Sequence, residues 1–302
     1  MNSPEPNFDS EIKESISRTS SKESAKNKLY LNSTTEHLTK LNFRTSKVSA
    51  ANNSKCTLKS ALVMAAVGGF SKIWTNWFNK TKIINIEKLE ACIKDNKPLI
   101  TVANHSSCAD DPLMWGMLSW DILVARPYLM RWTMAAKEIC FTNRFTSKFF
   151  TLGRCIPTVR GEGVYQKAVD TCLDVLKNDG WVHVFPEGKV NLMKQSMRLK
   201  WGVGRLIHEM NFTPTVIPMW HMGMDDVLPN TKPRIPRLGK TLTVLIGDPI
   251  CFEKILNDPE REKLSAAEIR IKIMAKIQQT LETLKIDAEH LHIKFINYND
   301  NK

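Results

Sequence analysis

The fold is decided by residues 99–112, which read LITVANHSSCADDP. The apolar run 99–103 predicts a buried strand, and Pro112 directly after two carboxylates is typical of the first turn of a helix. We therefore expect His105 in a strand-to-helix turn, in which Asp110 can fold back onto the imidazole ring. A carboxylate on one ring nitrogen fixes the tautomer and leaves the other nitrogen free to act as a base. The alternative is a capped helix beside an incidental histidine.

The composition indicates an anionic partner. The 302 residues include 43 Lys and Arg against 31 Asp and Glu, which gives a formal net charge of +12. Such an excess suits an acidic membrane surface or nucleic acid. The basic residues are dispersed, without a Lys/Arg block or zinc-finger spacing, and this argues against nucleic acid. Seven cysteines without a Cys-x-x-Cys pair predict reduced thiols and no metal site.

The N-terminal region divides into two parts. Residues 1–55 are polar and carry few large apolar side chains, so we expect a disordered tail. Its acidic residues make it a poor match to a mitochondrial presequence. The apolar run 61–70 is too short to span a bilayer, which needs about 18 residues. With lysines around it and Trp77 near its end, the segment 56–80 is expected to be a helix or hairpin in the membrane interface; a core helix is the alternative.

Strand and helix patterns alternate over the rest of the chain. Expected strands cover 99–103, 153–161, 181–185, 215–219 and 241–246, and expected helices cover 141–152, 165–176, 194–210 and a last segment that begins at the capping box Ser265-x-x-Glu268. The apolar stripe in 141–152 is expected to face the core, or else to be a second membrane-facing patch. This alternation predicts an α/β fold with a mostly parallel sheet flanked by helices.

Three polar residues lie at or just beyond the ends of three expected strands. Arg160 lies at the end of one, His105 and Glu187 come just after two others, and Gly188 follows Glu187 in a turn. In open parallel sheets, ligands bind beyond the carboxyl ends of the strands. We therefore expect these side chains to share one crevice. Arg160 offers a planar fork of donors to a phosphate group, while Glu187 suits a hydroxyl group or the orientation of Arg160.

Four blocks of the sequence resemble those of the glycerolipid acyltransferases related to lysophosphatidic-acid acyltransferase. They are His105-x4-Asp110 (an HX4D motif), residues 153–160, Phe185-Pro186-Glu187-Gly188, and residues 216–218. Within this family the stretch from about 62 to 292 is similar to the mitochondrial phospholipid–lysophospholipid transacylases. The second block departs from the family in its Ile156-Pro157 pair. The resemblance implies an acyltransferase domain over 81–292, with a short C-terminal tail at 293–302.

The resemblance also implies the chemistry of the site. His105 would be the general base oriented by Asp110, and Arg160, Glu187 and Gly188 would bind the glycerophosphate part of the acceptor. The implied reaction is acyl transfer between phospholipids and lysophospholipids without CoA, remodelling cardiolipin from monolysocardiolipin, with no cofactor. The implied location is the surface of a mitochondrial membrane, in a peripheral or monotopic mode, on a cardiolipin-rich surface. An acyl-CoA-dependent lysophospholipid acyltransferase and a non-catalytic lipid-binding protein of the same fold are the alternatives.

The remaining polar candidates are expected to have structural roles. Asp111 suits a helix cap better than catalysis, and there is no G-x-S-x-G elbow around Ser106, Ser107 or Cys108. His183 lies inside an expected strand, and His208 and His221 have no partners at metal-ligand spacing.

Overall fold

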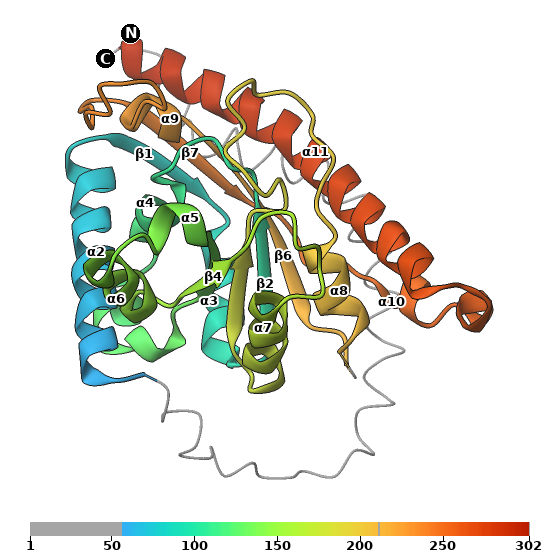
Figure 1. The fold of residues 1–302 in the computed structure, drawn as a ribbon. Helices are drawn as coiled ribbons and strands as arrows, with labels where there is room; N and C mark the ends of the chain where they lie inside the picture. The colour runs from blue at the N-terminus through green and yellow to red at the C-terminus, as the bar shows by residue number, and fades with distance from the viewer. Residues whose placement is uncertain (1–55, 211, 302) are drawn as a thin grey trace, which may run out of the picture. The chain divides into compact units, whose positions relative to one another are not determined.

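The computed structural model describes residues 56–210 and 212–301. Figure 1 shows a single sheet with helices on both faces. The strands are β1 Lys80–Ile84, β2 Leu99–Ala103, β3 Trp132–Ala136, β4 Cys155–Thr158, β5 Trp181–Val184, β6 Thr215–Met222 and β7 Thr241–Ile246. The helices are α2 Leu58–Trp77, α3 Ile86–Asp95, α4 Asp110–Met114, α5 Lys137–Cys140, α6 Arg144–Leu152, α7 Lys167–Lys177, α8 Gly202–His208, α9 Met224–Val227, α10 Glu253–Leu256 and α11 Ala266–Asp300. Short 3-10 and π turns cover Trp115–Met117 (η2), Asp121–Ala125 (η3), Pro127–Leu129 (η4) and Pro259–Lys263 (η5).

The seven strands are ordered β1-β7-β6-β2-β5-β3-β4. All neighbouring pairs are parallel except β6 and β7, which are antiparallel, so β1 and β7 run against the other five strands. The prediction of a mostly parallel α/β sheet is confirmed. The carboxyl ends of β2, β4 and β5, which precede the expected site residues, lie at one edge of the sheet.

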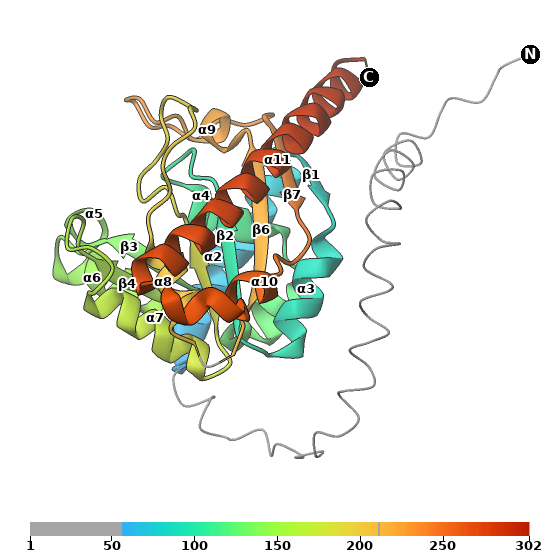
Figure 2. The same cartoon turned by 90° about the vertical axis from the view of Figure 1, so that its right-hand side faces the viewer.

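The sheet separates two hydrophobic cores. In β2, Leu99 belongs to one core and Ile100 to the other, because neighbouring side chains of a strand point to opposite faces. Helices α7, α8 and α11 cover the face that contains Ile100, and α2, α3 and α4 cover the face that contains Leu99. Figure 2 shows α11 crossing in front of the sheet on its side of the molecule.

Helix α2 is a single helix of 20 residues, not a hairpin. It packs closely on η2 because Gly116 of η2 has no side chain: a Cβ atom added there would lie 2.6 Å from the backbone carbonyl carbon of Ser71 in α2. The opposite side of α2 exposes large apolar side chains, and Trp77 is 82% exposed. Among residues 56–210 and 212–301, no helix combines the length and hydropathy that crossing a bilayer requires. The expected tail 1–55 lies outside the described residues.

Several elements differ from the sequence-based expectation. The helix expected over 194–210 is formed only at Gly202–His208, because the preceding segment bonds elsewhere, with the Lys200 amide donating to the Pro186 carbonyl at 2.7 Å. Phe141 lies outside α6, between that helix and α5. Strands β1 and β3 and helix α3 were not anticipated. The capping box at Ser265 begins α11 as predicted, and this helix continues to Asp300 through most of the segment expected as a C-terminal tail.

Candidate active site

The turn after β2 brings His105 and Asp110 together. Asp110 is the first residue of α4, and its Oδ2 atom lies 2.9 Å from His105 Nδ1. The same oxygen accepts hydrogen bonds from the amides of Ser106, at 2.6 Å, and Ser107, at 2.8 Å. Because a carboxylate oxygen is an acceptor, the tautomer of His105 that fits this contact has its N–H group at Nδ1, which donates a hydrogen bond to the buried Asp110. Nε2 is thus left as the basic nitrogen of His105.

The His105 ring is also held from the side. It stacks on the ring of Phe185 with a centroid distance of 4.2 Å and an interplanar angle of 15°. The His105 carbonyl accepts a hydrogen bond from the Asn191 amide at 2.7 Å, and the Ser106 carbonyl accepts one from Asn230 Nδ2 at 2.7 Å. Two distant loops therefore fix the backbone of the turn. The rigid backbone and the stacked ring leave His105 little freedom to leave its bond to Asp110.

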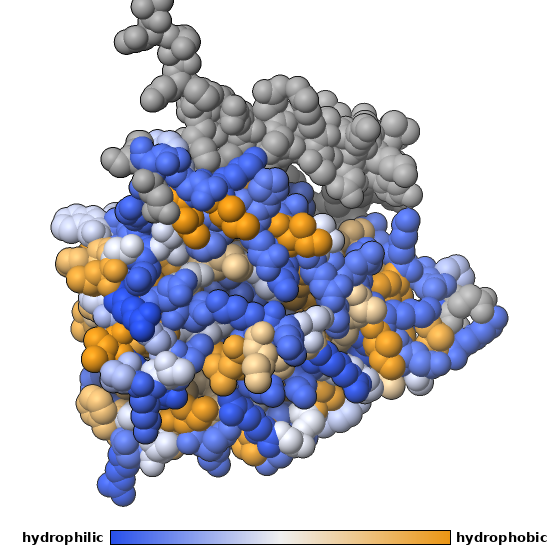
Figure 3. Space-filling model, turned by 90° about the horizontal axis from the view of Figure 1, so that it is seen from above, coloured by the Kyte–Doolittle hydropathy of each residue, from blue (hydrophilic) through white to orange (hydrophobic). Residues whose placement is uncertain are grey.

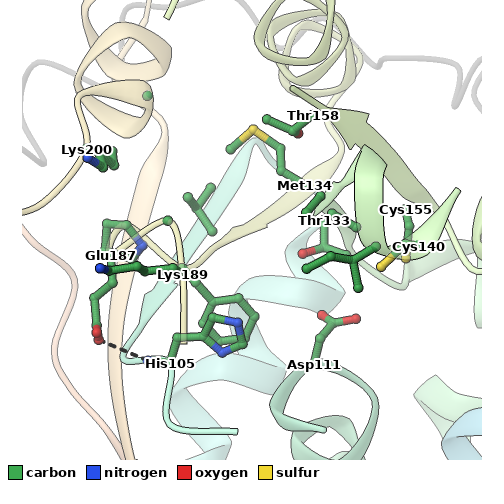
Figure 4. A pocket seen from close by; sticks show the side chains of 18 of the residues that line it. His105, Asp111, Thr133, Met134, Cys140, Cys155, Thr158, Glu187, Lys189 and Lys200 are labelled. Atoms are coloured by element: carbon green, nitrogen blue, oxygen red, sulfur yellow. Dashed lines mark hydrogen bonds between the residues drawn. The ribbon is translucent and has the colours of Figure 1, made fainter. Parts of the chain in front are cut away.

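Glu187 contacts the backbone of His105 rather than its ring. Its Oε1 atom accepts a hydrogen bond from the His105 amide at 3.0 Å, drawn as a dashed line in Figure 4. Burial raises the pKa of the Glu187 carboxyl above its usual range, although this hydrogen bond partly lowers it. Gly188 follows in a left-handed conformation with φ of 72°, which lets the chain turn beneath the side chain of Lys200.

A large cavity of about 1390 Å³ opens at this edge of the sheet. Its lining includes His105, Arg160, Glu187 and Gly188, so the expected convergence of these residues on one crevice is observed. Apolar side chains from α2, β3 and α6 form much of the remaining wall. In Figure 4, Lys189 and Lys200 lie on the Glu187 side of the cavity. The cavity is therefore lined by cationic and by apolar side chains, and His105 lies in its wall.

Arg160 lies at the cavity but is not tightly held. Its side chain is 49% exposed and forms an ion pair with Glu138 at 3.3 Å. Glu187 bonds to the His105 amide instead, so the contacts of Arg160 do not support the idea that Glu187 orients it. A half-exposed guanidinium with a surface partner can exchange that partner for an anionic ligand at little cost.

Asp111 has a partner that the sequence did not reveal. Instead of capping a helix, its carboxylate forms an ion pair with the buried guanidinium of Arg131, and its Oδ1 atom accepts a hydrogen bond from Trp115 Nε1 at 3.1 Å. Burial alone would raise the pKa of Asp111, but Arg131 and these hydrogen bonds outweigh it and hold that pKa below its usual range. Arg131 also donates to the Gly153 carbonyl at 3.3 Å, so this pair ties α4 to the start of β4.

Two of the remaining candidates behave as structural residues. Burial lowers the pKa of His183 to about 3, and its Nδ1 atom lies 2.8 Å from Thr101 Oγ1 inside the sheet. Burial also lowers the pKa of His208, with help from nearby arginines. Among residues 56–210 and 212–301, no cluster of three or more His, Cys, Asp or Glu side chains is arranged to hold a metal ion.

The chain is similar in sequence to several known proteins. A family model described as "Acyltransferase" matches residues 80–222. Tafazzin of Drosophila melanogaster is 45% identical over 236 residues, which cover 77% of this chain and 62% of that protein. Taffazin of Dictyostelium discoideum is 41% identical over 203 residues, which cover 65% of this chain and 70% of that protein. An N-acylphosphatidylethanolamine synthase of Arabidopsis thaliana is 35% identical over 264 residues, which cover 76% of this chain and 93% of that protein.

These similarities, together with the His105–Asp110 pair in the turn after β2, define the class. The chain belongs to the glycerolipid acyltransferase family. Within that family, its sequence is similar to the tafazzins. The match spans about three fifths of the Drosophila relative's length.

Proposed function

We propose that this protein transfers fatty acyl groups between phospholipids and lysophospholipids without CoA, and that it remodels cardiolipin from monolysocardiolipin. The observation that carries the proposal is the hydrogen bond of 2.9 Å between His105 Nδ1 and Asp110 Oδ2 at the wall of a large, mainly apolar cavity. The similarity to the tafazzins supports the choice of lipids as both donor and acceptor.

The reaction follows from the contact between His105 Nδ1 and Asp110, which leaves Nε2 free. A free hydroxyl group of the lysophospholipid attacks the ester carbonyl of the donor, and His105 Nε2 removes its proton as the new C–O bond forms. Asp110 stabilises the imidazolium that results. The tetrahedral intermediate then collapses, the bond to the donor's glycerol oxygen breaks, and His105 returns the proton to that oxygen. The products are an acylated acceptor and a new lysophospholipid, so the sequence of steps is reversible.

The cations that line the cavity suit the acceptor's headgroup. Arg160, Lys189 and Lys200 are among its lining residues, and Arg160 can leave Glu138 for a phosphate. Glu187 is an anion, so it would orient the His105 backbone and receive a glycerol hydroxyl rather than contact phosphate. Gly188, in its left-handed conformation, forms the next part of the cavity wall without a side chain. The apolar wall from α2 and α6 would hold an acyl chain.

The exposed apolar side chains of α2 support a peripheral position on a membrane. Leu62, Phe70 and Trp77 are 61%, 59% and 82% exposed on this helix, and Trp120 and Val124 of the adjacent η3 region are about half exposed. The face seen from above in Figure 3 differs from this surface of α2, because its apolar side chains form several patches separated by hydrophilic ones. The net charge of +12 favours an anionic surface, and the tafazzin similarity favours a mitochondrial one.

The test uses purified protein on vesicles that contain a phospholipid with a labelled acyl chain and an unlabelled lysophospholipid. Labelled acyl chains should appear on the lysophospholipid without CoA, and the His105→Ala variant should bind the vesicles but transfer nothing. Transfer that begins only when acyl-CoA is supplied would assign the protein to the CoA-dependent acyltransferases. Equal transfer by the wild type and the variant would remove His105 from the mechanism.

The assay should also separate ester products from amide products. The Arabidopsis relative is named for the synthesis of N-acylphosphatidylethanolamine. Vesicles that contain phosphatidylethanolamine therefore serve as a second acceptor, in which the nucleophile is an amine rather than a hydroxyl group. Labelled amide as the main product would replace the proposed acceptor with phosphatidylethanolamine.

A further inference from the structure

His221, near the end of β6, forms two backbone hydrogen bonds with the side chain of Asn104, the residue that precedes His105. The His221 amide donates to Asn104 Oδ1 at 2.9 Å, and Asn104 Nδ2 donates to the His221 carbonyl at 3.0 Å. Both residues are buried, and His221 is completely inaccessible to solvent. The backbone of His221 thus fixes Asn104, and with it the point at which the chain leaves β2 for the turn.

The imidazole ring of His221 also lies close to Asp110, the partner of His105. Its Nε2 atom lies 2.8 Å from the Asn104 carbonyl oxygen and 3.5 Å from Asp110 Oδ2. A carbonyl oxygen is only an acceptor, so Nε2 carries a hydrogen and donates it. The ring N–H group therefore bonds to the carbonyl of the residue before His105, and the same nitrogen lies close to the carboxylate partner of His105.

The other ring nitrogen shows that this arrangement is costly. His221 Nδ1 is buried and has no hydrogen-bond partner among the described residues. An unpaired polar atom in a core costs free energy that an apolar side chain of similar size would avoid. The neighbouring side chains of β6 on this face, such as Met219, are apolar. A buried imidazole among them therefore requires an explanation, and the contacts of Nε2 provide one.

We propose that His221 is a positioning residue for acyl transfer, which holds Asp110 and the His105 turn in register through its Nε2–H group. The inference rests on the proposed function. Asp110 Oδ2 already receives the N–H groups of Ser106, Ser107 and His105, and the N–H group of His221 approaches the same oxygen. The carboxylate is thus held before His105 gains its proton, and it need not move when the imidazolium forms.

Two amide substitutions separate this role from simple packing. In His221→Gln the side-chain nitrogen can reach the Nε2 position, whereas in His221→Asn it reaches only the Nδ1 position. We expect His221→Gln to keep kcat for vesicle-based acyl transfer within about threefold of wild type, and His221→Asn to lower kcat about tenfold, the factor expected for one lost hydrogen bond, with KM unchanged. The matched control is His292→Gln, a buried histidine of α11 that contacts Thr243 at 2.9 Å and should affect stability more than kcat.

The outcomes can be told apart. Equal kcat in the folded Gln and Asn variants, whether high or low, would overturn the positioning role. If neither variant folds, nitrogen NMR of histidine-labelled wild-type protein decides, because the proposal requires the tautomer of His221 with the proton on Nε2, and a proton on Nδ1 contradicts it. His105→Ala is measured alongside: if it still transfers acyl chains, the proposed function fails, whereas loss in His105→Ala with full activity in His221→Asn contradicts only the inference about His221.

Discussion

Asp111 forms an ion pair with Arg131, twenty positions along the chain, while its neighbour Asp110 bonds to His105. Two adjacent carboxylates therefore face different partners. One is bound to the candidate base, and the other links α4 to the segment before β3. Substitution of each by its amide should separate these two roles.

We expect Asp110→Asn to lower kcat by about 10³- to 10⁴-fold with little change in vesicle binding, because an amide at this position favours the wrong histidine tautomer. Asp111→Asn should instead lower the free energy of unfolding by about 3 kcal/mol, since it leaves the buried Arg131 without its partner. The measurements are single-turnover transfer and chemical denaturation of both variants. Comparable losses of kcat in the two variants would show that Asp111 also takes part in the reaction.

Glu187→Gln should raise stability near neutral pH. Because burial raises the pKa of Glu187 in the folded state, the wild type loses stability as pH rises from the unfolded-state value through the folded-state value. The amide variant has no such loss, so its advantage should be present near pH 7 and disappear toward pH 4. Melting temperatures measured across this range test the prediction. An advantage that grows as the pH falls would contradict it.

His183 should make the protein sensitive to mild acid. Its folded-state pKa of about 3 lies below the usual value, so folding excludes a proton that the unfolded chain binds. The stability due to the neutral form is complete above about pH 6.5, and each unit below it should remove about 1.4 kcal/mol. His183→Asn should lose this dependence, and its stability gap to wild type should narrow between pH 6.5 and 5. Parallel curves for the two proteins would exclude His183 as the source.

Arg160→Ala should weaken acceptor binding without affecting the fold. The ion pair with Glu138 is half exposed, and such pairs contribute about 0–1 kcal/mol. If Arg160 binds the acceptor's phosphate, KM for the lysophospholipid should rise about tenfold, the effect of one lost charged hydrogen bond, while kcat stays nearly constant. Glu138→Gln is the matched control, since it removes the same ion pair but leaves the guanidinium. If KM rises in Glu138→Gln but not in Arg160→Ala, Arg160 does not bind the acceptor's phosphate.

Vesicle binding should depend on one face of α2. Replacement of Leu62, Phe70 and Trp77 by Ser should release the protein from anionic vesicles in a flotation assay, because these side chains are exposed and apolar. The matched control replaces three exposed isoleucines of α11 by Ser, namely Ile271, Ile286 and Ile293. If the α11 variant no longer binds the vesicles and the α2 variant still does, the membrane contact lies on the α11 side of the sheet instead.

The sequence predicted the fold class and the position of the crevice because both depend on local patterns. The strand at 99–103, the Pro112 helix start and the polar residues after β4 and β5 are visible in short windows. The ion pair between Asp111 and Arg131 joins residues of separate elements, so no window contains both. The same holds for His221, whose contacts with Asn104 and Asp110 cross from β6 to the turn after β2.

Helix periodicity failed where long-range bonds decide the backbone. Residues 194–201 carry a helix-like pattern, but the Lys200 amide bonds to the Pro186 carbonyl and Lys194 takes a left-handed conformation with φ of 53°. The chain here follows the turn that contains Glu187 rather than its own propensity. This tertiary contact places Lys200 at the wall of the cavity.

Helix α2 contributes both to the cavity wall and to the exposed apolar surface. Val63, Met64 and Val67 line the cavity, while Leu62, Phe70 and Trp77 are exposed. On the proposed membrane position, the helix that touches the bilayer also forms part of the wall of the cavity that contains His105. A lipid would then arrive by lateral diffusion, and its encounter rate would follow its mole fraction in the surface rather than its concentration in the bulk. Inert lipid would act as a two-dimensional diluent, slowing the enzyme without binding to it.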